Sequence, residues 1–219
     1  MFYPNRQVLG DQLATKLSQY RNSDAIILCL KRSSLLSCIE LAAHLHAYIY
    51  ILQYSEVEDP YDITRPLGAI TSDGEFVLNP DIRRNEYEYI CSSFSGTVDQ
   101  RKQVAFSKIN SESNLNPGFK IAAFNNRPCL VFADILKTTF QTQIAFEMLK
   151  PCKPTTIYGA FGNITSTISD KFQLEANGCT FMDVLASTTF DDEHFFDQPD
   201  KYTEEQKIKM ANSISLYWA

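Results

Sequence analysis

The chain has 219 residues, with 20 basic and 26 acidic side chains, which give a formal net charge of −6. Its 44% of apolar and 21% of charged residues are typical of a globular protein and exclude a largely disordered chain. The acidic balance disfavours binding to nucleic acid, because proteins that bind phosphate backbones carry basic surfaces.

The first quarter of the chain predicts alternating helices and strands. Leucines recur every four residues near the N-terminus, which is the spacing of an amphipathic helix. Two later runs are apolar or β-branched without a break, as in strands that are buried on both faces. In chain order we expect a helix at 7–20, a strand at 25–30, a helix at 33–47 capped by Ser33 or Ser34, and a strand at 48–53.

A turn dipeptide, Asp73-Gly74, stands between two apolar runs and predicts a β-hairpin over residues 67–79. The segment 85–118 that follows is polar and charged, with a helical tendency at 98–109. The second half of the chain then alternates buried strands with helices. We expect strands at 128–134, 155–161 and 179–185, and helices at 138–149, 164–176 and 203–216.

Buried strands that alternate with helices indicate βαβ units. The predicted fold class is therefore α/β, with a mostly parallel sheet flanked by helices and a small hairpin elaboration. We expect a single domain over residues 1–219. A chain of this length buries roughly 70% of its unfolded surface and needs no disulfide or metal for its stability.

Three features favour a cytoplasmic protein. The apolar run 25–30 is far shorter than the roughly 18 residues of a membrane span. No basic region followed by an apolar stretch stands near Met1, so we expect no secretory signal. The six cysteines are scattered singly, without a C-x-x-C pair, which disfavours a zinc site and indicates a reducing compartment.

The turns after the first and third predicted strands hold the candidate binding residues, because ligands of parallel sheets bind outside the carboxyl ends of the strands. Both turns lead into a helix N-terminus, where backbone N–H groups and the helix dipole favour anions. Asp134 at a strand end could accept from ribose hydroxyls or hold Mg²⁺. Helix capping and ordinary solvation explain the same residue types, so this alternative stays open. The residues are Lys31, Arg32, Ser33 and Ser34 in the first turn, and Asp134, Lys137, Thr138 and Thr139 in the second.

Four segments match, in order and spacing, those of a bacterial phosphoribosyltransferase-like family. They are the opening segment with Phe2, an arginine, Gly10 and Leu13-Ala14; the hairpin from Gly68-Ala69-Ile70 to Val77-Leu78-Asn79; Cys129 to Gln141, in place of the phosphoribosyl diphosphate (PRPP) motif; and the aromatic-acidic Asp191 to Asp197. The sequence thus resembles this family over nearly its whole length. The resemblance implies a type I phosphoribosyltransferase-like fold.

The binding loops depart from the family pattern. Of the two adjacent acids that grip the ribose in the family, only Asp134 is present, after Ala133. Ile135 and Thr139 stand where the phosphate loop has glycines, and the first-strand loop also lacks its two glycines. Backbone N–H groups reach a phosphate closely only where such positions are small and conformationally free. We therefore expect a degenerate active site, and we expect Phe140 to crowd the phosphate seat.

The resemblance also implies roles for single residues. Asp134 would be the catalytic residue and the Mg²⁺ ligand, with Mg²⁺ needed only if the protein is active. Thr138 and Thr139, with Lys137, would hold the 5-phosphate, and Lys31 and Arg32, beside Ser33 and Ser34, would hold diphosphate. Phe195 would stack on a base, unless it is a core residue under the last helix.

Three hypotheses follow for function. The first is a phosphoribosyltransferase-like protein that binds PRPP, ribose 5-phosphate or a nucleotide, with weak or lost transferase activity. The second is an active glycosyltransferase of nucleotide metabolism that moves phosphoribosyl from PRPP to an unidentified acceptor. The third is a non-catalytic regulatory or interaction protein. None of the three involves nucleic acid or a membrane, and whether the chain forms a homodimer stays open.

Overall fold

The computed structural model describes residues 2–111, 116 and 120–217. In these residues one sheet has five parallel strands in the order β2-β1-β6-β7-β8, and a second has three antiparallel strands in the order β3-β4-β5. The strands are β1 (Ile26–Cys29), β2 (Tyr48–Ile51), β3 (Tyr54–Glu58), β4 (Pro66–Thr71), β5 (Phe76–Leu78), β6 (Pro128–Leu136), β7 (Thr156–Ile164) and β8 (Cys179–Val184). The predicted α/β class, with a mostly parallel sheet, is confirmed.

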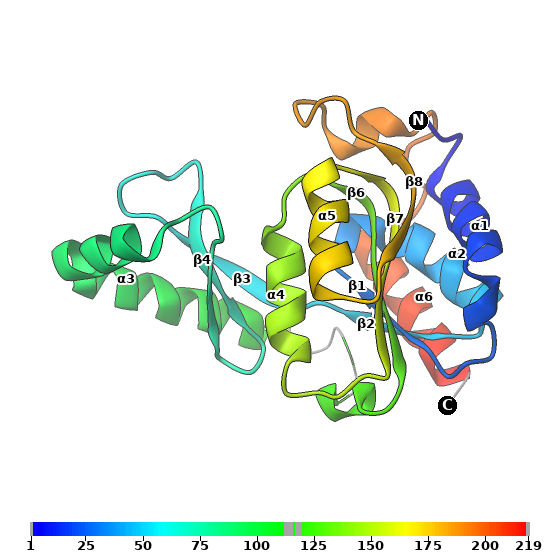
Figure 1. The fold of residues 1–219 in the computed structure, drawn as a ribbon, viewed down its shortest axis with the longest axis horizontal. Coiled ribbons are helices and arrows are strands. Elements are labelled where there is room, and N and C mark those ends of the chain that lie inside the picture. Colours follow the sequence, from blue (N-terminus) through cyan, green and yellow to red (C-terminus); the bar gives the residue numbers. More distant parts are fainter. Residues whose placement is uncertain (1, 112–115, 117–119, 218–219) are drawn as a thin grey trace.

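Helices cover both faces of the parallel sheet (Figure 1). One face packs against α1, α2 and α6, and the other packs against α4 and α5. The α-helices are α1 (Arg6–Lys16), α2 (Leu35–Leu45), α3 (Arg84–Ser111), α4 (Phe140–Leu149), α5 (Ser166–Glu175) and α6 (Glu204–Tyr217), and the 3₁₀ turns are Ser18–Tyr20, Arg32–Ser34, Ile121–Phe124 and Asp192–Phe195. Each central strand is apolar on both faces, as the unbroken runs in the sequence predict.

The second sheet and α3 form an arm that projects beside α4 (Figure 1). The hairpin predicted around Asp73-Gly74 is present as β4 and β5, and Gly74 has a positive φ of 85° that the turn requires. Strand β3, which the sequence analysis missed, pairs with β4. Only Ser55 and Val57 of β3 are buried, so the strand carries too few apolar residues to be recognised.

Helix α3 is much longer than the predicted segment 98–109 and is interrupted at Phe94, whose φ and ψ are non-helical. Its buried residues, Ile90, Val98, Ala105 and Ile109, pack against the hairpin. The polar composition of the rest of the helix hides this narrow apolar stripe from sequence analysis.

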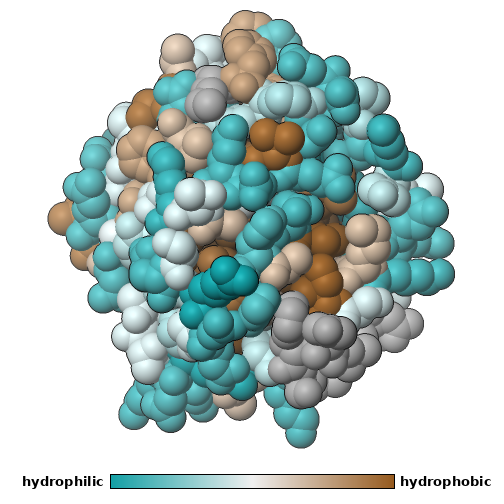
Figure 2. Space-filling model, turned by 90° about the vertical axis from the view of Figure 1, so that its right-hand side faces the viewer, coloured by the Kyte–Doolittle hydropathy of each residue, from teal (hydrophilic) through white to brown (hydrophobic). Residues whose placement is uncertain are grey.

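The surface beside α1 and α2 is mostly hydrophilic, with separate smaller apolar patches (Figure 2). Among the described residues, no helix combines the length and the apolar character needed to cross a membrane.

Candidate functional site

The point where the strand order reverses lies between β1 and β6. From β1 the chain passes to β2 on one side, whereas β6 pairs with the other side of β1. Open α/β sheets bind ligands outside the carboxyl ends of the strands at such a point. The two loops predicted to bind phosphate follow β1 and β6, so the fold brings them together at this edge.

An open cavity of about 550 Å³ lies beside the first of these loops. Lys31, Arg32 and Ser33 line it, and Gln141 from the first turn of α4 reaches it from the second loop. The hydroxyl of Thr138 donates to Gln141 Oε1 at 2.9 Å, which links the second loop to the first turn of α4. The remaining lining residues include a further cation, Lys108 of the arm, and the carboxylates Glu56 and Glu58. The three cations of the cavity wall outnumber its two carboxylates, so the wall suits an anionic ligand.

Asp134 does not face this cavity. It is fully buried, and both of its carboxylate oxygens are engaged. Oδ2 accepts from Arg6 Nε at 2.8 Å, and Oδ1 accepts from the hydroxyl of Ser34 and from the backbone N–H of Ile135 at 2.8 Å. The hydroxyl of Ser34, which is also fully buried, is thereby used within the protein instead of capping α2.

Mg²⁺ does not fit Asp134 in this arrangement. Mg²⁺ bound to a protein carboxylate normally keeps several waters in its coordination shell. The carboxylate of Asp134 is enclosed next to the guanidinium of Arg6, which leaves no room for them. In the part of the chain that the structure describes, no three His, Cys, Asp or Glu side chains come together as a metal site.

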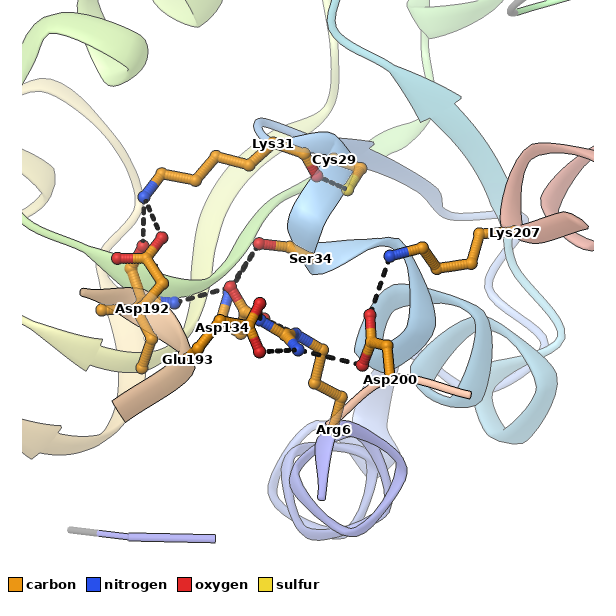
Figure 3. A network of polar contacts seen from close by, with 10 residues as sticks. Arg6, Cys29, Lys31, Ser34, Asp134, Asp192, Glu193, Asp200 and Lys207 are labelled. Carbon is orange, nitrogen blue, oxygen red and sulfur yellow. Dashed lines mark hydrogen bonds and ion pairs between the residues drawn. The ribbon is translucent and has the colours of Figure 1, made fainter. Parts of the chain in front are cut away.

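Arg6 is the centre of a buried ion-pair network (Figure 3). Its guanidinium binds Glu193 through two bonds of 2.8 and 3.0 Å and Asp200 at 2.9 Å, in addition to Asp134. It also lies 4.3 Å from the centre of the Phe196 ring. Burial alone would lower the pKa of Arg6, but the bonds to Glu193 and the other carboxylates raise it above its ordinary value. The network ties α1, the end of β6 and the segment before α6 into one unit.

A second ion-pair cluster joins the two candidate loops. Asp192 Oδ2 lies 2.9 Å from Lys31 Nζ, and Asp192 Oδ1 lies 2.9 Å from Lys137 Nζ. Lys31 also donates to the carbonyl of Ile135, and Lys137 donates to that of Phe190. Burial alone would raise the pKa of Asp192, but the two lysines hold it below its ordinary value. Both predicted phosphate-binding lysines thus have a carboxylate partner within the chain.

The other predicted residues take varied positions. Thr138 is exposed, and Thr139 precedes α4 without a capping bond from its side chain. Phe140 does not crowd the space before α4, because its side chain is buried in the core, and Ile135 is buried in the core on the opposite face of the sheet. Backbone N–H groups of the α4 N-terminus are therefore not covered by these two bulky side chains.

Phe195 lies in the hydrophobic core and is 7% exposed. The aromatic rings near it that reach the surface are those of Phe2, Phe190 and His194, which border a pocket of about 210 Å³ at the end of β8. The rings of Phe190 and His194 are stacked with their centres 4.5 Å apart. Phe195 also lines this pocket, and its ring contacts those of Phe2 and His194.

Sequence reasoning missed the role of Arg6 and the place of Gln141. Arg6 lies on the same helix face as Leu9 and Leu13. An arginine within an apolar stripe needs a buried acidic partner, so this position in the sequence could have indicated its role. Gln141 gives no such signal, because a glutamine in the first turn of a helix is common on solvated faces.

Comparisons with known proteins bear on the fold. No family model matches this sequence, and no curated protein matches it. Among solved structures, TT1426 from Thermus thermophilus is similar over 100% of both chains, with a TM-score of 0.71 and 17% sequence identity. This likeness shows a shared fold over the full length of the chain.

Other solved structures are less similar to this chain than TT1426 is. A hypoxanthine phosphoribosyltransferase from Staphylococcus aureus matches at a TM-score of 0.43 and 14% identity, over 82% of this chain and 72% of that one. A hypothetical protein from Neisseria gonorrhoeae with bound ppGpp matches at a TM-score of 0.47 and 12% identity, over 99% and 94% of the two chains.

Proposed function

We propose that this protein is phosphoribosyltransferase-like, that it binds a phosphosugar or a nucleotide at the carboxyl edge of its parallel sheet, and that its transferase activity is weak or lost. The motifs that resemble the family support the ligand class. The observation that carries the proposal is the cavity beside β1, where Lys31, Arg32 and Ser33 meet the first turn of α4 through Gln141. An anion there would have cationic side chains on one side and a helix N-terminus on the other.

The weak activity follows from the state of Asp134 and the two loops. Phosphoribosyl transfer depends on stabilising charge on the leaving diphosphate and on the sugar. Here the acid that would contact the ribose is buried against Arg6, and residues with side chains replace the glycines of both phosphate loops. Loss of one preorganised donor typically costs about 10²–10³ in rate. From an ordinary turnover of about 10 s⁻¹, we expect at most about 0.1 s⁻¹.

The test is pyrophosphate release from PRPP and Mg²⁺ with a panel of purine and pyrimidine acceptors. We expect a thermal shift on addition of PRPP, with pyrophosphate release at or below this slow rate. Fast, saturable release would contradict the loss of activity and favour an active transferase. Neither a thermal shift nor release would favour the non-catalytic interaction protein.

A further inference from the structure

The carboxylate of Asp192 bridges two cations that come from the two loops of the candidate site. One carboxylate oxygen binds Lys31 Nζ and the other binds Lys137 Nζ, each at 2.9 Å. Lys31 follows β1 and Lys137 follows β6, so the bridge spans the point where the strand order reverses. A phosphate group offers two oxygens in a similar arrangement with more negative charge.

The bridge formed by Asp192 is connected to both the 550 Å³ cavity and the aromatic pocket, through residues that line each of them. Lys31 lines the 550 Å³ cavity, and the carbonyl that accepts from Lys137 belongs to Phe190, which lines the 210 Å³ aromatic pocket. All three charged side chains are about one-fifth exposed, at 18%, 20% and 20% for Lys31, Lys137 and Asp192. An anion from solution can therefore reach the lysines without unfolding of the core.

We infer that Lys31 and Lys137 form a phosphate-binding pair and that Asp192 occupies it as an internal counter-ion, which an incoming phosphate or diphosphate group must displace. This inference rests on the proposed function and adds a regulatory contact to the same site. Lys31, Lys137 and Asp192 carry a net charge of +1, and release of the carboxylate leaves two cations facing the ligand.

The segment around Asp192 is held so that the carboxylate can leave while its neighbours stay. Glu193 is bound to Arg6, and the carbonyl of Phe195 accepts from the backbone N–H of Tyr3 at 2.9 Å. These contacts fix the 3₁₀ turn Asp192–Phe195 from its far side. Only the contacts of the Asp192 side chain must be exchanged for those of the ligand. The apparent dissociation constant then equals the intrinsic one divided by the fraction of molecules in which the lysines are open.

The experiment is a calorimetric titration with inorganic pyrophosphate of the wild-type protein and of the variants Asp192→Asn and Asp191→Asn. Asp191 is exposed and next in sequence, so its variant makes the same change in net charge outside the bridge. We expect Asp192→Asn to bind pyrophosphate about tenfold more tightly than wild type, a change of about 1.4 kcal/mol, and Asp191→Asn to bind as wild type does. Adding Lys137→Ala to Asp192→Asn should remove the gain.

Equal affinities of Asp192→Asn and wild type would overturn the inference, and so would the same gain in Asp191→Asn, since that is a general charge effect. A second readout uses the wild type alone. Saturating pyrophosphate should shift the NMR signal of the Asp192 side-chain carboxyl carbon, whereas an unchanged signal contradicts displacement of this carboxylate. A tighter Asp192→Asn in a protein that ignores ribose 5-phosphate would keep this inference and reject the proposed function.

Discussion

Replacing Arg6 by methionine is expected to lower the free energy of unfolding by about 3–5 kcal/mol. Arg6 is 1% exposed and is bound to Asp134, Glu193 and Asp200, so its removal leaves the buried carboxylate of Asp134 without its counter-ion, whereas Asp200 keeps Lys207 as a partner. The carboxylate of Asp134 is fully buried and has no access to water as a substitute partner. Urea unfolding of the variant and the wild type measures the loss.

The matched control is Arg84→Met, which makes the same substitution at a side chain that is 90% exposed and pairs with Glu88. Exposed pairs of this kind are worth about 0–1 kcal/mol, so we expect little change. Arg6→Lys keeps the charge but loses the planar two-bond contact with Glu193, and its stability should lie between those of the wild type and Arg6→Met. A loss below about 1 kcal/mol for Arg6→Met would show that the network does not hold the site together.

Replacing Gly162 by alanine is expected to cost about 3 kcal/mol, the upper part of the range for overpacked cores. A Cβ atom at this position would overlap the carbonyl oxygen of Asp134 and would lie 2.9 Å from Cδ2 of Leu9. The first of these atoms is backbone in the neighbouring strand β6, so it can move only if the paired strands separate. The same movement would disturb the position of Asp134.

Gly96→Ala is the control for this prediction, because no heavy atom lies within 4 Å of the added Cβ atom. Gly96 lies within α3, where alanine stabilises a helix by about 0.5–1 kcal/mol relative to glycine. Thermal unfolding of both variants should therefore show changes of opposite sign. Equal melting temperatures of Gly162→Ala and the wild type would contradict the close approach of β7 to β6.

The parallel sheet was predictable because its strands are buried on both faces. The runs 25–30 and 128–133 carry no polar interruption, and their alternation with helices specifies the class. The hairpin was predictable from Asp73-Gly74, since glycine readily adopts the positive φ of such a turn. Strand β3 was not predictable, because only two of its residues are buried and two positions do not make a recognisable alternation.

The candidate site was predictable only in part. The two loops could be located, because the carboxyl ends of neighbouring parallel strands meet at one edge. Two pairings could not be predicted, that of Asp134 with Arg6 and that of the two lysines with Asp192. In both, the partners lie far apart in the chain and leave no spacing pattern. These contacts decide which side chains face a ligand, and they depend on how the segment before α6 returns over the sheet.

The measurement that tests the central claim most directly is a calorimetric titration of the wild-type protein with PRPP. We predict saturable binding at one site, and we predict binding at least about tenfold weaker for Arg32→Ala, because a hydrogen bond to a charged group contributes about 1.5–3 kcal/mol. The control Lys150→Ala, at the opposite end of α4, should bind as the wild type does. No saturable heat at millimolar ligand, or unchanged affinity of Arg32→Ala, would contradict a sugar-phosphate site at this edge of the sheet.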